Sequence, residues 1–167
     1  MEIIDNFLDQ KKFDELQPLM MGENFVWYYS DVIDYKGQKD KFMFFHMFYA
    51  RAGPTSPFLE QLNPTIEMID PVSLFRIKAN LLTRTSNIIE NEFHVDMEDY
   101  LSKEKLKQWA TSIFYVNTNN GYTEFEDGTK VESVANRMIT FPGNLKHRGT
   151  SCTDEKTRVV INFNYFK

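Results

Sequence analysis

The sequence predicts a mainly β-stranded fold with flanking helices (α+β), and two observations point to this class. From Ser73 onward, short segments rich in β-branched and aromatic residues alternate with turn residues, a pattern typical of a sandwich or barrel. Before Ser73, helical and strand-like segments are mixed. The 167 residues contain no internal repeat and no Gly/Ser linker. We therefore expect one domain over 1–167, with a helix-rich support over 1–72 and a β core over 73–167.

The support is expected to begin with an amphipathic helix over 7–22. Gly22 is the expected stop of this helix, and Pro18 is expected to kink it near its end. Four apolar side chains share one face of the helix: Phe13, Leu16, Leu19 and Met20. This face is expected to pack against the rest of the domain.

Two strands and a second helix are expected in the remainder of the support. The strands are predicted at 23–33 and 42–50, where aromatic residues dominate. The helix is predicted over 56–71, with an interruption at Asn63 and Pro64, because a residue before proline avoids the helical conformation.

The β core is expected to consist of short strands joined by turns. Turn signals are NNG at 119–121, EDG at 126–128 and FPGN at 141–144. The predicted strands cover 73–82, 92–97, 110–118, 122–126, 129–134, 137–141 and 158–166.

Composition narrows the functional classes. The net charge is −5, which gives no reason to expect a nucleic acid as partner. Cys152 is the one cysteine, so a disulfide framework is excluded. The N-terminal sequence MEIIDNFLDQKKF lacks the basic and apolar regions of a secretory signal, and no apolar run is long enough for a membrane helix. We expect a cytoplasmic protein without a membrane partner.

His94 and Asp96 form a His-x-Asp pair within the predicted strand 92–97. Residues i and i+2 of a strand face the same way, so both side chains would project together, as two ligands of one metal require. A surface turn, or a core histidine bonded to a nearby carboxylate, is the alternative for an isolated pair of this kind.

His147 and Arg158, which lie much farther along the chain, extend the pattern. His147 follows the turn signal FPGN, and Arg158 opens the last predicted strand. Two histidines and one carboxylate form the facial triad of non-heme Fe(II) oxygenases.

The last predicted strand, 158–166, alternates in polarity. Arg158, Val160, Asn162 and Asn164 face one side and Val159, Ile161, Phe163 and Tyr165 the other. This alternation suits a sheet that lines a polar pocket, where Arg158 would bind a carboxylate.

On these residues the sequence resembles the 2-oxoglutarate- and Fe(II)-dependent dioxygenases, specifically their prolyl-hydroxylase-like branch. The resemblance covers the β core and rests on five motifs: HVD at 94–96, SIFYVN at 112–117, NGYTEF at 120–125, FPGNLKH at 141–147 and TRVVINFNYF at 157–166. It implies a double-stranded β-helix, a distorted, cupin-like jelly roll. It also implies an enzyme that uses Fe(II), 2-oxoglutarate and O2 to hydroxylate a C–H bond.

The resemblance also implies residue roles. His94, Asp96 and His147 would hold the iron, and Arg158 would bind the far carboxylate of 2-oxoglutarate. Three further residues would line or contact the cosubstrate: Tyr115, Thr123 and Asn162.

The sequence departs from the family pattern in two places. Leu82 stands near the position of a family tyrosine, which Asn80 or Lys78 would have to replace, and the usual Gly-Gly before Thr-x-Phe is Asn-Gly-Tyr. These departures concern the cosubstrate contacts and not the metal ligands.

The substrate implied by the family is a peptidyl residue or a small metabolite. Nucleic-acid demethylases of this type resemble one another in an Arg-x-Asn-x-x-x-Arg signature, which Arg158 does not begin. Two alternatives stay open. One is a non-enzymatic jelly-roll module that binds a metal or ligand, and the other is a cupin-type metalloenzyme that does not use 2-oxoglutarate.

Three other features have two interpretations each. His46 is expected to be a packed, hydrogen-bonded residue, with a substrate contact as the alternative. Arg76 would either reach the barrel mouth or pair with a surface acid. The segment 101–109 is expected to be a loop or short helix, with a lid over the active site as the alternative.

Overall fold

The computed structural model describes residues 1–33, 41–97 and 100–167. Its strands are β1 (Glu2–Ile4), β2 (Tyr28–Ser30), β3 (Met43–Ala50), β4 (Gly53–Pro54), β5 (Ser73–Thr83), β6 (Trp109–Tyr115), β7 (Asn119–Phe125), β8 (Lys130–Ser133), β9 (Arg137–Pro142), β10 (His147–Gly149) and β11 (Thr157–Phe166). Its helices are α1 (Gln10–Met21), the 3-10 helix η1 (Pro57–Leu62), α2 (Asn63–Ile69) and α3 (Lys103–Leu106).

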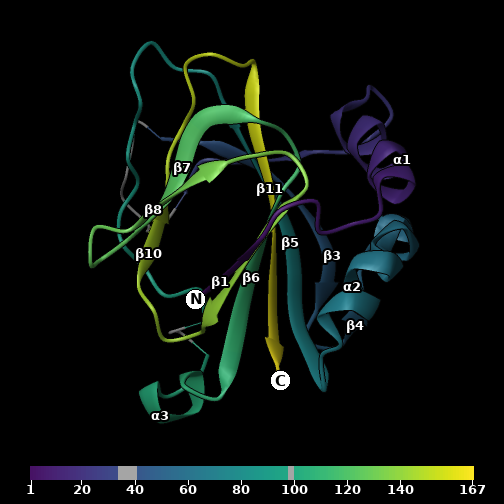
Figure 1. Ribbon diagram of the computed structural model, residues 1–167, viewed down its shortest axis with the longest axis vertical. Helices are drawn as coiled ribbons and strands as arrows, with labels where there is room; N and C mark the ends of the chain where they lie inside the picture. The colour runs from purple at the N-terminus through teal and green to yellow at the C-terminus, as the bar shows by residue number, and fades with distance from the viewer. Residues whose placement is uncertain (34–40, 98–99) are drawn as a thin grey trace.

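The described strands form a major and a minor sheet. The major sheet has the order β1-β9-β6-β11-β5-β3-β2, with β4 paired to β3, and the minor sheet has the order β10-β7-β8. In Figure 1 the minor sheet lies on one side of the major sheet, and α1 and α2 lie on the other. The long strands β5 and β11 pair along nearly their whole length at the centre of the major sheet.

Apolar side chains form one cluster on each face of the major sheet. The larger cluster packs under the helices and includes Phe13 of α1, Phe114 of β6 and Phe163 of β11. The smaller cluster lies between the two sheets and includes Phe125 of β7 and Val160 of β11. The alternation predicted for the last strand is therefore confirmed, since its odd-numbered residues from Val159 to Tyr165 belong to the larger cluster.

The first helix begins later than predicted. The side chain of Asp9 caps α1 by accepting a hydrogen bond from the backbone N of Lys11 at 3.0 Å, so the helix starts at Gln10 and not at residue 7. The predicted inward face is confirmed, because Phe13, Leu16 and Met20 are buried. Gly22 caps the end of the helix, as predicted, and Pro18 lies inside it.

The second helical segment changes from a 3-10 helix to an α-helix where an interruption was predicted. The physical reason predicted for the interruption is wrong, because Asn63, the residue before the proline, is itself helical with φ −52° and ψ −45°. A 3-10 helix, η1, ends at Leu62, and α2 begins at Asn63 with Pro64 in its first turn. Asp70 ends α2 in the left-handed conformation, with φ 48°. Both helices cover the outer face of the major sheet, where Leu62 is fully buried.

Two strand predictions are wrong in extent. Of the segment 23–33, only Tyr28–Ser30 forms a strand. The segment 92–97 is not a strand, since it makes a single isolated β-bridge at His94 and then turns at Asp96 and Met97. Met97 is fully buried, so this turn is anchored by its apolar side chain and not by a ladder of hydrogen bonds.

The NNG turn signal at 119–121 is also wrong, because these residues open strand β7. The pairing of β7 with β8 is irregular between Asn119 and Tyr122, which is where Gly121 lies. The EDG and FPGN signals do mark turns.

The segment 101–109 contains α3, and Leu106 of that helix is buried. Within the described residues, none of the helices has the length and apolar character needed to cross a membrane.

Candidate metal centre

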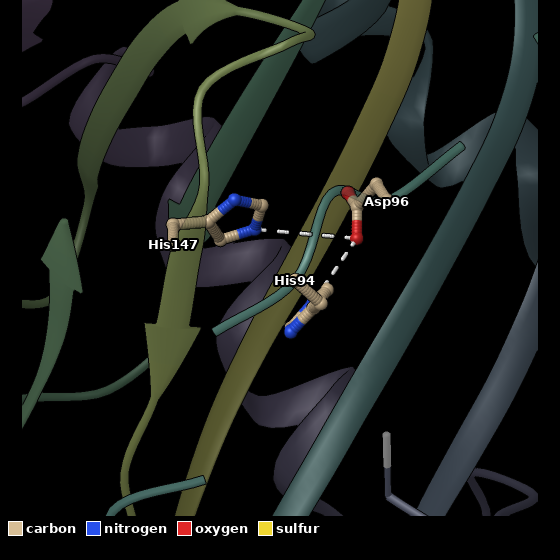
Figure 2. A group of neighbouring side chains, drawn as sticks. All are labelled: His94, Asp96 and His147. Carbon is tan, nitrogen blue, oxygen red and sulfur yellow. Dashed lines mark ion pairs between the residues drawn. The ribbon is translucent and has the colours of Figure 1, made fainter. Parts of the chain in front are cut away.

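The backbone places His94 directly beside His147. The two residues exchange both backbone hydrogen bonds of an isolated antiparallel bridge, at 3.0 Å each. His147 begins β10 of the minor sheet, and Asp96 follows His94 at the turn. Figure 2 shows the three side chains converging from these two segments.

The ligand atoms of the three side chains lie within 4.8 Å of one another. Oδ1 of Asp96 is 3.6 Å from Nε2 of His94 and 4.0 Å from Nε2 of His147. His147 and the carboxylate of Asp96 are buried, and His94 is about a quarter exposed. This is the group predicted as metal ligands from the sequence, although Asp96 reaches it from a turn and not from a strand.

Hydrogen bonds set the tautomer of both imidazoles. Nδ1 of His94 lies 3.1 Å from the backbone O of Glu92, and Nδ1 of His147 lies 3.2 Å from that of Leu145. A protonated Nδ1 donating to a carbonyl leaves Nε2 with a lone pair. Nε2 of His147 is buried and has no hydrogen-bond partner within the described residues. A divalent metal ion between these atoms would satisfy it, so the residues fit such an ion.

The electrostatic environment keeps the ligands in metal-binding form. Burial acts to raise the pKa of Asp96, but the positive charge of Arg76 and the interaction with His94 outweigh it and hold that pKa well below its usual range. Burial lowers the pKa of His147 to about 4, against the opposing charge of Asp96. At neutral pH the site therefore offers an ionised carboxylate and a neutral buried imidazole, as metal ligation requires.

A buried cation lies deeper between the sheets. Arg158 of β11 is 3% exposed, and its Nε donates to Oγ of Ser133 at 2.8 Å. Its Nη2 donates to Oγ1 of Thr123 at 3.2 Å, and Thr123 also accepts a hydrogen bond from the hydroxyl of Tyr115 at 2.8 Å. The guanidinium lies 5.7 Å from the centre of the Tyr115 ring.

Arg158 has no carboxylate partner within the described residues, and burial lowers its pKa. An unpaired buried charge costs several kcal/mol, so the guanidinium is a strong site for an anionic ligand. Two glycines allow its position. A Cβ on Gly121 would stand 2.6 Å from Cδ of Arg158, and one on Gly149 would stand 3.3 Å from its Nη1. The Asn-Gly-Tyr departure therefore keeps the glycine that Arg158 needs.

One cavity of about 220 Å³ joins the metal ligands to Arg158. Pockets for drug-sized ligands span roughly 300–1,000 Å³, so this cavity suits a smaller molecule. Leu82, the residue in place of the family tyrosine, contributes to its wall. Of the sequence-predicted site residues, the structure brings six together in its lining: His94, Asp96, Thr123, His147, Arg158 and Asn162. Tyr115 lies behind Thr123 and is fully buried.

Comparisons with known proteins identify the fold. No family model matches the sequence, and no curated protein matches it. Among solved structures, a prolyl hydroxylase from Trichoplax adhaerens, in complex with a hypoxia inducible factor peptide fragment, matches with a TM-score of 0.70 and 14% identity. The match covers 99% of this chain and 82% of that one.

Two further solved structures match over nearly the whole chain. The non-heme α-ketoglutarate-dependent epimerase SnoN, from nogalamycin biosynthesis, has a TM-score of 0.69 and 11% identity over 99% of this chain and 77% of that one. HygX from Streptomyces hygroscopicus, with nickel and 2-oxoglutarate bound, has a TM-score of 0.64 and 9% identity over 98% of this chain and 81% of that one. The chain has the fold of the 2-oxoglutarate- and Fe(II)-dependent oxygenases. The predicted double-stranded β-helix is thereby confirmed.

Side-chain contacts decide between the two interpretations of His46 and of Arg76. His46 is structural, because its ring nitrogens lie 2.7 Å from the backbone O of Val26 and 2.7 Å from Oγ of Ser56. Arg76 lines the cavity, as the first interpretation predicted, and it pairs there with a buried acid and not with a surface acid. Its Nη2 lies 3.3 Å from Oδ1 of Asp96, inside the candidate metal centre.

Sequence reasoning missed two contributors to this site. Ser133 holds Arg158, and Asn164 donates to Asp96 at 2.8 Å. Asn80, one possible replacement for the family tyrosine, does line the cavity, with its amide oxygen buried and without a partner within the described residues. The position of Asn164 on the polar face of β11 was a usable signal, although it did not identify the partner.

Proposed function

We propose that the chain is a 2-oxoglutarate- and Fe(II)-dependent oxygenase that hydroxylates a C–H bond. The observation that carries the proposal is the joint lining of one small cavity by a His-Asp-His cluster and a buried arginine without a carboxylate partner within the described residues. Bound Fe(II) supplies the oxidation of a C–H bond by O2 as 2-oxoglutarate is converted to succinate and CO2.

The residues of the chain bind and orient the reactants. His94, Asp96 and His147 would hold the metal on one side and leave positions open toward the cavity. Arg158, with Thr123 beside it, would hold the far carboxylate of 2-oxoglutarate through charge-assisted hydrogen bonds. The apolar wall made by Leu82, Ile113 and Val160 would limit the water that reaches the bound keto acid.

The two alternative functions explain less of the site. A cupin-type metalloenzyme without 2-oxoglutarate would use the three metal ligands but has no need of Arg158. A binding module without catalysis could hold its ligand with either the three metal ligands or Arg158, and it has no need of both in one cavity. The bound 2-oxoglutarate and nickel in HygX support the oxygenase as the function that uses both features.

A groove beside the metal cavity is the proposed route for substrate. It has a volume of about 460 Å³ and shares Arg76 and Tyr100 with the cavity. The guanidinium of Arg51 stacks 4.0 Å from the Tyr100 ring and 5.4 Å from that of Phe75, which gives the groove an aromatic wall. The prolyl hydroxylase neighbour binds a peptide and HygX binds hygromycin B, so a peptidyl residue and a small metabolite are the two substrate classes proposed.

Succinate formation tests the proposal. The protein is freed of metal, loaded with Fe(II) and given 2-oxoglutarate and O2, and succinate is measured by mass spectrometry. We expect slow formation without substrate, its loss in Asp96→Ala, and its retention in Asp14→Ala, which removes an exposed carboxylate on α1. A protein that holds Fe(II) but neither forms succinate nor binds 2-oxoglutarate would contradict the assignment and favour the binding module.

A further inference from the structure

The two carboxylate oxygens of Asp96 have different surroundings. Oδ1 faces Nε2 of both histidines, at 3.6 and 4.0 Å. Oδ2 accepts a hydrogen bond from Nδ2 of Asn164 at 2.8 Å. One oxygen is therefore directed at the candidate metal position, and the other is engaged by the major sheet.

The amide of Asn164 is fixed in this orientation by its other contacts. Asn164 is fully buried on β11, and its Nδ2 also donates to Oγ1 of Thr111 at 3.1 Å. Its Oδ1 accepts a hydrogen bond from Nε of Arg76 at 2.9 Å. Rotating the amide by half a turn would place its NH2 group against the N–H of Arg76 and its oxygen against Asp96, so the alternative orientation is excluded.

Arg76 contacts both partners at once. It pairs with Asn164 in the register of β5 with β11, which brings its side chain across the carboxylate. While Nε holds Asn164, Nη2 lies 3.3 Å from Oδ1 of Asp96. The planar guanidinium is suited to this double contact, because its donors are held in a rigid fork.

Asp96 depends on such support more than a strand residue would. It lies at a turn, two residues after a bridge made by a single residue pair. A ladder of backbone hydrogen bonds therefore does not fix its side-chain direction. The contacts from Asn164 and Arg76 come instead from the two long central strands of the major sheet, which are rigid elements.

We propose that Asn164 and Arg76 are positioning residues that make Asp96 a metal ligand through Oδ1 alone. This inference rests on the proposed function. A carboxylate bound through both oxygens would occupy one of the positions that the facial triad leaves open for cosubstrate and O2. By holding Oδ2, Asn164 keeps that position available, and Arg76 keeps Asn164 in the required orientation.

The test compares Asn164→Leu and Arg76→Met with Ser112→Ala. The first two remove the donors to Asp96 with little change in side-chain size. Ser112→Ala is the matched control, because the Ser112 hydroxyl is buried on the neighbouring strand and hydrogen-bonded to Tyr165 at 2.9 Å, and within the described residues it makes no hydrogen bond to Asp96. Circular dichroism of the metal-free proteins establishes that each is folded, and Arg76→Met serves if Asn164→Leu does not fold.

Three readouts separate positioning from general destabilisation. Calorimetric titration with Co(II) is expected to show an affinity about 10- to 100-fold weaker in Asn164→Leu and Arg76→Met, and unchanged in Ser112→Ala. The visible absorption of the Co(II) proteins, which depends on coordination geometry, is expected to change only in the first two. Anaerobic titration of the Fe(II) proteins with 2-oxoglutarate is expected to show weaker 2-oxoglutarate binding in Asn164→Leu and Arg76→Met and unchanged binding in Ser112→Ala.

Folded Asn164→Leu and Arg76→Met proteins that match the wild type in Co(II) affinity, Co(II) spectrum and 2-oxoglutarate affinity would overturn the inference and leave the proposed function intact. A wild-type protein that binds neither Co(II) nor Fe(II) would instead overturn the proposed function, and this inference with it.

Discussion

The ring centroids of His94 and His147 lie 4.9 Å apart, with the ring planes tilted by 48°, across a β-bridge formed by the same two residues. The backbone contact therefore sets the spacing of the two candidate ligands directly. Asp96 is added from the turn that follows, under the control of side chains on the major sheet. The metal centre is thus held by both sheets of the β-helix, which explains how so short a bridge can position it.

His94→Ala is expected to abolish metal-dependent turnover with little effect on folding. The side chain is about a quarter exposed and lies at the end of a one-pair bridge, so its removal costs the metal-free protein within about 1 kcal/mol of unfolding free energy. Urea denaturation of the metal-free variant and calorimetric metal titration measure the two effects. A global loss of folding would show that the histidine is structural.

The metal-free protein is expected to lose stability as the pH falls from 6.5 to 4. The pKa of His147 is lowered to about 4 by burial, so between these values the unfolded chain binds the proton that the folded chain excludes. The unfolding free energy therefore decreases toward acid, by roughly 3 kcal/mol if this group acts alone. Urea denaturation across this range measures the slope, and a His147→Gln variant is expected to reduce it. An equal slope in that variant would assign the effect to other groups.

Gly121→Ala is expected to weaken 2-oxoglutarate binding without affecting the metal. The added Cβ would stand 2.6 Å from Cδ of Arg158 and 2.7 Å from the backbone O of Ser151, so the arginine must move. Overpacking of this kind costs about 1–3 kcal/mol. Gly128→Ala is the matched control, because its φ of +87° strains an alanine but nothing lies within 4 Å of the added atom. Equal cosubstrate affinity in the two variants would contradict the role given to Gly121.

The site could be predicted from the sequence where the relevant pattern is local. The alternation along β11 placed Arg158 and Asn162 on the cavity side, because a strand reverses its side chains at every residue. The proximity of His94 and Asp96 was predicted correctly, but from a strand that the structure replaces with a bridge and a turn. Buried Met97, rather than strand pairing, determines that turn.

Contacts between distant segments could not be predicted in the same way. Asn164 lies 68 residues from Asp96 and 88 from Arg76, and its role depends on the register of β5 with β11. The sequence pattern predicts which face each strand presents but not this register. Gly121 shows the same limit, since the NNG motif predicts a turn locally and its glycine is required by the packing of Arg158.

The most direct test of the proposed oxygenase is the visible charge-transfer absorption of Fe(II) chelated by 2-oxoglutarate, recorded without oxygen. We expect the band to appear in the wild type. In Arg158→Gln it should require a much higher 2-oxoglutarate concentration, because losing a buried charge partner costs about 2–5 kcal/mol. Metal affinity should stay unchanged in that variant. If the wild type binds Fe(II) and no band forms at saturating 2-oxoglutarate, the cavity serves another ligand and the central claim is wrong.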